Sequence, residues 1–410
     1  MFSKNFLKDL FFPLLILTKN SVVIAALSYV LTIMLANQFG PAEFGIYSQA
    51  LIYASLFSII INFGTEQTAS ADIAAHNNSV ETLSCFTWLR LVMFGASSIA
   101  AYLILSEDGF LLYFVFVLAL TNFNLSFYYE IRKENSRYSY IYLIERIVYI
   151  SGAFALIGFD MLSLEYIFML YAAATIASLL FQFQDSRVLT SIIVKGLFRR
   201  IIFLIQQNLP LVITGLAVFT LGGISRLVMD SNLGTEALGI YSAGWQMVTI
   251  ASIYQAQVVR VWRLKISKAI QEKNASEFFD CVKTYLILGV VPMCLIAVFF
   301  WLSSDWIVRF IFTEEYAPLA TLLPTFGLLV VVISMNGLVE ICWIATGKTQ
   351  IYMVTAIFYG LLMLVMLYFF SDGYGILEFA KLTTGVHTAL MITLFVFWYQ
   401  RVYPSLIRKT

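Results

Sequence analysis

Charged side chains are scarce in this chain of 410 residues: Lys, Arg, Asp and Glu together make up 12% of it, whereas 60% is hydrophobic. That leaves too little polar surface to cover a water-soluble core of this size. A bilayer core about 30 Å thick needs roughly 20 apolar residues per helix, and the chain is an almost unbroken series of such runs. Long continuous runs predict helices rather than a closed barrel. We therefore expect an all-α integral membrane protein.

Sequence features typical of nucleic-acid binding, metal binding and ATP hydrolysis are also missing. The net charge is +1 and no Lys/Arg-rich cluster compensates for it, which argues against a nucleic-acid binder. The two histidines lie far apart, and there is no Gly-rich phosphate loop of the Walker type. The four cysteines fall within or beside apolar runs without metal-ligand spacing: Cys85, Cys281, Cys294 and Cys342. We expect no metal, no cofactor and no ATP hydrolysis.

The apolar runs predict twelve membrane spans. They lie near 12–35, 44–68, 83–105, 110–129, 138–159, 162–182, 201–229, 238–262, 279–303, 319–346, 350–370 and 374–399. The first run continues to Leu35 without a clear small-residue cleavage site, so we interpret it as an uncleaved span rather than a signal peptide. The connections are too short to hold a separate soluble domain.

The distribution of basic residues predicts the orientation, because cytoplasmic loops retain Lys and Arg. With a cytoplasmic N-terminus, the outer loops hold Arg309 alone and instead collect acids such as Glu107, Asp108 and Glu314. The inner segments hold Lys4, Lys8, Arg132, Lys133, Arg137, Arg187, Lys195, Arg199, Arg200, Arg263, Lys265, Lys268, Lys273, Lys348, Arg401, Arg408 and Lys409. This asymmetry predicts an even number of spans and two cytoplasmic termini.

An internal repeat joins the two halves at a constant offset of 194 residues. Gly40, Gly45, Ile46, Tyr47 and Ser48 match Gly234, Gly239, Ile240, Tyr241 and Ser242. Because six spans separate the copies, the halves share one orientation. We expect two six-helix bundles, 1–190 and 191–410, related by a pseudo-two-fold axis along the membrane normal. Two such bundles would enclose a central cavity suited to alternating access.

Three segments resemble those of Wzx-type polysaccharide flippases, within the superfamily that also contains the multidrug and toxin extruders and the lipid II flippase. They are Phe39-Gly40-Pro41-Ala42-Glu43-Phe44-Gly45-Ile46-Tyr47, then Asn62-Phe63-Gly64 with Thr68 to Ala74, and Phe312-Thr313-Glu314-Glu315-Tyr316-Ala317-Pro318. The chain departs from the family pattern at Ala71, often a basic residue, at Asn62, often Asp, and at Thr313, often Gly.

The resemblance implies a function that composition alone does not reach. It implies translocation of an undecaprenyl-pyrophosphate-linked oligosaccharide, such as an O-antigen or capsule repeat unit, across a bacterial inner membrane, with ion coupling. It implies the lipid-linked sugar and the bilayer as partners, with a polysaccharide polymerase and a chain-length regulator beside them and no nucleic acid.

Charged residues inside predicted spans are the candidates for function, since a charge at the bilayer centre costs at least ~2.5 kcal/mol. Lys19, Arg90, Arg146 and Arg260 fall in the cytoplasmic third of spans one, three, five and eight. If they face the cavity, they form a cationic ring that would receive the pyrophosphate through paired hydrogen bonds. The alternative is that such long side chains extend to the lipid headgroups, above all Arg260.

Three further charges and one proline complete the candidate set. Glu66, Glu340 and Lys381 are candidates for ion coupling or for simple ion pairs. Pro210, in the polar start of the seventh span, is either a hinge or a structural kink.

Two rival functions stay open. A membrane-embedded O-antigen polymerase or ligase would act on the same carrier, but such enzymes resemble one another in a large outer loop that this chain lacks. A small-molecule extruder would share the fold, although a cationic inner third favours an anionic lipid-linked substrate. A purely structural protein would leave several charges at one depth unexplained. The sequence thus predicts a transporter and not an enzyme.

Overall fold

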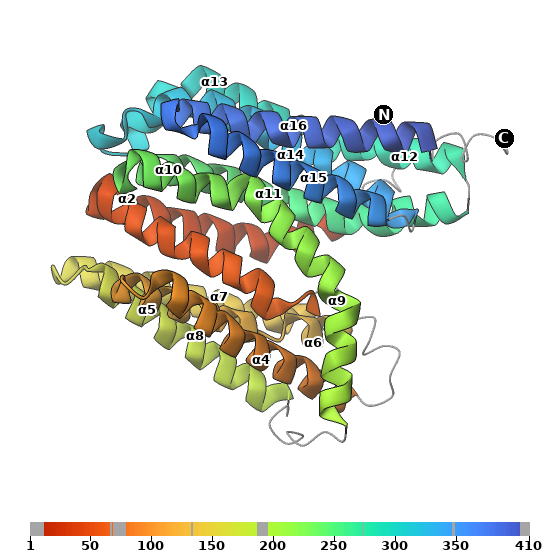
Figure 1. The fold of residues 1–410 in the computed structure, drawn as a ribbon, viewed down its shortest axis with the longest axis horizontal. Coiled ribbons are helices and arrows are strands. Elements are labelled where there is room, and N and C mark those ends of the chain that lie inside the picture. Colours follow the sequence, from red (N-terminus) through yellow and green to blue (C-terminus); the bar gives the residue numbers. More distant parts are fainter. Residues whose placement is uncertain are drawn as a thin grey trace. The chain divides into compact units, whose positions relative to one another are not determined.

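The computed structural model describes residues 12–65, 68, 79–132, 134–186, 196–272, 274–346 and 349–401, and every regular element in these ranges is helical (Figure 1). The longer helices are α2 (Phe12–Asn62), α4 (Ser79–Leu105), α5 (Gly109–Ala119), α7 (Asn135–Gly158), α8 (Leu164–Ser186), α9 (Leu197–Phe219), α10 (Ser225–Leu233), α11 (Thr235–Gln271), α12 (Ala275–Tyr285), α13 (Val291–Ile311), α14 (Leu319–Ala345), α15 (Thr349–Phe370) and α16 (Ile376–Arg401). The short elements are η2 (Leu120–Phe123), α6 (Ser126–Ile131), the π-helical turns η4 (Thr220–Ile224) and η5 (Leu286–Val290), η6 (Glu314–Tyr316) and η7 (Ser371–Gly373).

The helices have the length and the outer surface of membrane spans. Over the described residues, ten continuous helical stretches, some of which join neighbouring elements, are long and apolar enough to cross a bilayer. Large apolar side chains such as Leu103, Phe310 and Tyr368 are exposed on their outer faces, where lipid is the fitting solvent. The chain is therefore a multi-pass membrane protein.

The arrangement of twelve spans in two six-helix bundles stays a prediction. The first of the ten helices, Ala26–Asn62, contains parts of two predicted spans. Helix α11 covers the predicted eighth span and is not among the ten.

The chain forms two compact units. One consists of the chain up to Gly45 together with the chain from Thr220 onward, and the other runs from Ile46 to Phe219. The first unit is therefore discontinuous in sequence, and α2 contributes to both units. The division into 1–190 and 191–410 expected from the repeat follows other boundaries and stays a prediction.

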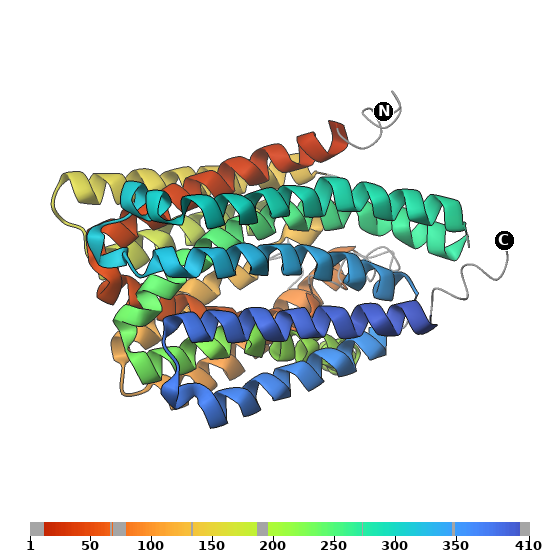
Figure 2. The ribbon, with the colours of Figure 1, turned by 90° about the horizontal axis from the view of Figure 1, so that it is seen from above.

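Helix α14 forms the centre of the first unit. It packs against α11, α13 and α16 (Figure 1), and α16 also lies along α15, as the dark and lighter blue helices show in Figure 2. The buried indole of Trp343 donates from Nε1 to the carbonyl of Leu394 at 3.1 Å, and the buried Trp262 donates to that of Cys281 at 3.1 Å. These bonds fix the large rings in an otherwise apolar core.

The two copies of the repeat begin helices in the same way. Gly40, inside α2, has φ +70° and ψ 174°, and Gly234, before α11, has φ +87° and ψ 169°. Only glycine adopts this conformation without strain. Each glycine breaks the helical run, which restarts at Pro41 and at Thr235.

The motif at Phe312–Pro318 holds the end of α13 against α2. Asn37 donates from Nδ2 to the carbonyl of Ile311 at 2.8 Å and accepts from the backbone N–H of Thr313 at 3.2 Å. The fully buried Tyr316 donates its hydroxyl to the carbonyl of Ala36 at 3.1 Å. These bonds join the end of α13 and the segment after it to α2.

Candidate substrate site

A break in the helical run of the second unit builds one side of the candidate site. After α5 and η2, Asn124 is extended (φ −59°, ψ 148°) before α6 begins. Such a break leaves carbonyls without helical donors. Asn122 anchors the break, since its Nδ2 donates to Ser58 Oγ and to the carbonyl of Ala119, both at 2.9 Å, while its Oδ1 accepts from Asn62 Nδ2 at 2.8 Å.

Arg90, on α4, satisfies the carbonyls of this break. Its Nη1 donates to the carbonyls of Asn122 at 2.8 Å and of Asn124 at 2.7 Å, and its Nε donates to Thr65 Oγ1 at 2.9 Å. The guanidinium also lies 5.1 Å from the ring centroid of Phe127, and the side chain is 1% exposed. Arg90 therefore holds the wall of the site through protein contacts.

A polar cavity of about 220 Å³ lies between this break and helices α7 and α8. Hydroxyls, amides and one ion of each sign line it: Thr121, Asn124, Tyr138, Tyr142, Glu145, Arg146, Tyr171, Thr175, Leu179 and Gln182. Gln182 is itself held, since its Oε1 accepts from the backbone N–H of Leu125 at 2.9 Å and its Nε2 donates to Ser178 at 3.1 Å. The lining of this cavity is polar, whereas the helices around it are mainly apolar.

The guanidinium of Arg146 sits among tyrosine rings. It lies 4.8 Å from the ring centroid of Tyr142 and 5.5 Å from that of Tyr171, and Nη2 donates to the Tyr142 hydroxyl at 2.7 Å. Its Nε is buried without a hydrogen-bond partner, and no carboxylate of the described residues lies within ion-pair distance. The positive charge is held by aromatic faces and keeps donor capacity for an anion.

The neighbouring Glu145 turns toward α8. Its Oε1 accepts from Thr175 Oγ1 at 3.4 Å, and Ser178 also donates to the carboxylate. Glu145 and Arg146 thus have separate partners, as their adjacent positions on one helix predict.

The structure relates two of the four predicted cations. Arg90 binds the carbonyl of Asn124, and Asn124 lines the cavity that contains Arg146. The backbones of Lys19 and Arg260 lie in α2 and α11, but their side chains are outside the described residues, so the cationic ring stays a prediction. Glu66 is also outside the described residues.

The remaining candidates are not among the residues that line this cavity. Glu340, on α14, is half-buried with Arg263 as its nearby charge, and the exposed Lys381 lies 4.0 Å from Glu378 on α16. Pro210 lies within α9, which continues through it to Phe219. Among the described residues, no group of three His, Cys, Asp or Glu could hold a metal ion.

The tyrosines of this cavity were not predicted from the sequence. Tyr138, Tyr142 and Arg146 follow one another at four-residue spacing, which places them on one helix face and was a usable signal. The rings of Tyr138 and Tyr142 are parallel, with centroids 6.3 Å apart. Tyr171 comes from another helix, and no local pattern points to it.

Comparisons of sequence give one family and one curated relative. The family model described as "Polysaccharide biosynthesis protein" matches residues 14–262. The "Capsular polysaccharide biosynthesis protein CapF" of Staphylococcus aureus is 22% identical over 185 residues, which are 44% of this chain and 46% of that protein. The match thus spans a little under half the length of this relative.

Comparisons of structure give transporters of one superfamily. A structure described as "Lipid II flippase MurJ, inward closed conformation" has a TM-score of 0.71 at 14% identity, covering 93% of this chain and 86% of that chain. A multidrug resistance MATE family transporter of the MOP superfamily, inward-facing, has a TM-score of 0.65 at 12% identity, covering 94% and 95%. The chain therefore has the fold of MOP-superfamily transporters.

Proposed function

Because this chain belongs to the polysaccharide biosynthesis protein family, we propose that it is a flippase for undecaprenyl-pyrophosphate-linked oligosaccharide repeat units, such as O-antigen or capsule units. It moves them from the cytoplasmic to the periplasmic leaflet of a bacterial inner membrane by ion-coupled alternating access, with both termini in the cytoplasm. The family membership confirms the resemblance that the sequence motifs indicated.

The observation that carries the proposal is Arg146 in its cavity. Arg146 lies nine residues into the span Arg137–Gly158, about 14 Å along the helix at 1.5 Å per residue. A charge at such depth is costly unless it is paired or functional. Its hydrogen-bond and ring partners among the described residues are tyrosines, and the Glu145 carboxylate is a nearby opposite charge beyond ion-pair distance, so an anionic ligand would complete its contacts.

The proposed roles follow from these contacts. Arg146 binds the pyrophosphate, for which a planar guanidinium offers paired donors. Arg90 positions the cavity wall, while Lys19 and Arg260 extend the cationic surface. Glu340 and Glu66 are the acids proposed for ion coupling, Lys381 forms a surface ion pair, and Pro210 is the proposed hinge. A polysaccharide polymerase and a chain-length regulator are the proposed protein partners.

The test is export of repeat units in cells that lack the protein. We expect lipid-linked units to accumulate on the cytoplasmic face, and export to return with the unaltered gene. Arg146→Ala should reduce restored export about 10- to 100-fold, because a charge-assisted hydrogen bond contributes about 1.5–3 kcal/mol. Adding Lys19→Ala to it should remove the remainder.

The chain contains a matched control for Arg146→Ala. Arg132 lies 5.2 Å from the ring centroid of Tyr128, its own i−4 tyrosine, and donates to that hydroxyl, but it is exposed and close to Glu134. Arg132→Ala should restore export fully. Normal export in cells without the protein, with no second flippase present, would reject the flippase and make a small-molecule extruder the leading function.

A further inference from the structure

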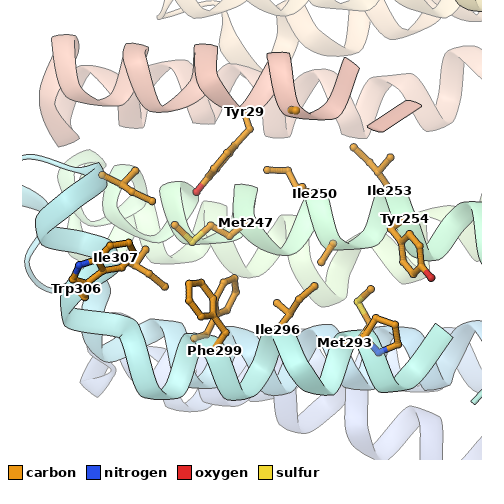
Figure 3. Close-up of a pocket in the computed structure, with 15 residues that line it drawn as sticks. Tyr29, Met247, Ile250, Ile253, Tyr254, Met293, Ile296, Phe299, Trp306 and Ile307 are labelled. Carbon is orange, nitrogen blue, oxygen red and sulfur yellow. The ribbon is translucent and has the colours of Figure 1, made fainter. Parts of the chain in front are cut away.

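An apolar cavity of the first unit has no role in the site around Arg146. It has a volume of about 630 Å³ and lies in the first unit, between α2, α11 and α13 (Figure 3). Figure 3 shows Tyr29 reaching from α2 into this space, with Met247 and Ile250 on α11 and Ile296 and Phe299 on α13 around it. Cavities of this size and lining are typical of ligand sites.

The residues that line this cavity are almost all apolar. The lining is Ala26, Tyr29, Met247, Ile250, Ala251, Ile253, Tyr254, Pro292, Met293, Ile296, Phe299, Phe300, Trp306, Ile307 and Ile311. It contains no charged residue, and the Tyr254 hydroxyl donates to the carbonyl of Leu288 at 2.6 Å. Water needs two or more polar partners to be stable in a cavity, so this one favours an apolar occupant.

Hydrogen bonds to the backbone fix one wall of the cavity. The π-helical turn η5 comes directly before α13 and Pro292. Two carbonyls of this turn have side-chain donors, because Tyr254 binds that of Leu288 and Ser334 Oγ binds that of Gly289 at 3.2 Å. The irregular turn is therefore fixed from α11 and from α14. A pre-formed wall binds a flexible ligand without first having to order itself.

A hydrocarbon chain can also reach the cavity from the surrounding bilayer. Ala26, Phe299 and Trp306 line it and are exposed. Met247 and Met293 are flexible and polarizable, so they adapt to an irregular, methyl-branched chain. A lipid-linked oligosaccharide has such a chain as its one large apolar part.

We propose that this cavity binds the polyisoprenoid chain of the substrate. The inference rests on the proposed flippase function and adds a contact with the lipid tail to the contact proposed for the pyrophosphate. The cavity then selects a branched polyisoprenoid over the straight acyl chains of bulk phospholipids.

Photo-crosslinking of the full chain in lipid nanodiscs tests the proposal. The probe is a sugar-free polyisoprenyl diphosphate that carries a diazirine on its chain, and the labelled residues are mapped by mass spectrometry. We expect labels in 247–254 and 292–300, displaced by unlabelled polyisoprenyl diphosphate and not by an equal excess of phosphatidylglycerol. Labels spread evenly over α15 and α16, or displacement by phosphatidylglycerol, would overturn the proposal.

Filling the cavity gives a second measurement with a matched control. In Ile250→Trp/Ile296→Trp the labelling should fall about tenfold or more, since two indoles occupy the space of the chain. Ile392→Trp, at an exposed position of α16, should label as the unaltered chain does. Unchanged labelling of the filled variant would also overturn the proposal.

The export assay separates this inference from the function on which it rests. If export requires the protein but the cavity is not labelled, the flippase function stands and the chain site is rejected. If the cavity is labelled while export proceeds without the protein, the chain site stands and the flippase function is rejected.

Discussion

Gly45 and Gly239 each lie against the start of the helix that carries the other. A Cβ on Gly45 would come within 2.0 Å of the carbonyl oxygen of Thr235, and a Cβ on Gly239 within 1.9 Å of that of Pro41. The two positions correspond in the internal repeat, five residues after Gly40 and Gly234. The repeat therefore packs on its own copy, and both glycines are required because backbone atoms occupy the space of a side chain.

Gly239→Ala should destabilise the protein by roughly 1–3 kcal/mol or more, since the clash is with a backbone carbonyl that has to move. Gly385→Ala is the matched control: Gly385 lies within α16, and a Cβ there would meet no atom within 4 Å. Alanine is the better helix former, so the control should be neutral or stabilising. Thermal unfolding of the purified protein in detergent measures both. Equal midpoints for the two variants would contradict this packing.

Arg90→Ala should lower stability by about 2–5 kcal/mol, because the buried carbonyls of Asn122 and Asn124 lose their donor. Arg90→Lys should recover only part of this, since an ammonium cannot reproduce the fixed fork of a guanidinium. The folded fraction that elutes as a monodisperse peak in size-exclusion chromatography gives the measurement. Arg199→Ala, at an exposed position of α9, is the control, and a drop of the same size there would show that any lost arginine has this effect.

Tyr171→Leu should weaken binding of a polyisoprenyl diphosphate by roughly 2- to 30-fold, whereas Tyr171→Phe should bind nearly as the unaltered chain does. The reason is that the ring face, which contributes about 0.5–2 kcal/mol by holding the Arg146 guanidinium, survives only in the second variant. Binding is measured by native mass spectrometry of the detergent-purified protein. If both variants lose affinity equally, the hydroxyl and not the ring face is what matters.

Local sequence signals predicted the helices, the internal repeat and the family resemblance. Apolar runs of spanning length mark the helices, and the glycines at 40 and 234 do break helices in the same conformation. The sequence does not distinguish Arg90 from Arg146, because each is a charged residue inside an apolar run. Their different surroundings arise from Asn122, Asn124 and Tyr171, which come from other segments, so no local pattern separates the two arginines.

The discontinuous unit and the apolar cavity had no sequence signal at all. The walls of the cavity come from three separate helices, and the space appears only when α2, α11 and α13 are brought together beside a π-helical turn. The hydropathy of a helix indicates its average environment, but it does not predict which helices are its neighbours.

Because the first unit is discontinuous, the order in which the chain is made differs from the order in which it packs. Asn37 is bonded to Ile311, 274 residues later, and Ala36 accepts from Tyr316. At a synthesis rate of about 5–20 residues per second, the first helix waits roughly 15–55 s in the bilayer for these partners. Until then the Asn37 amide has neither of the backbone partners that it has in the folded protein. The first helix therefore completes these contacts only after the end of α13 and the segment that follows it have been made.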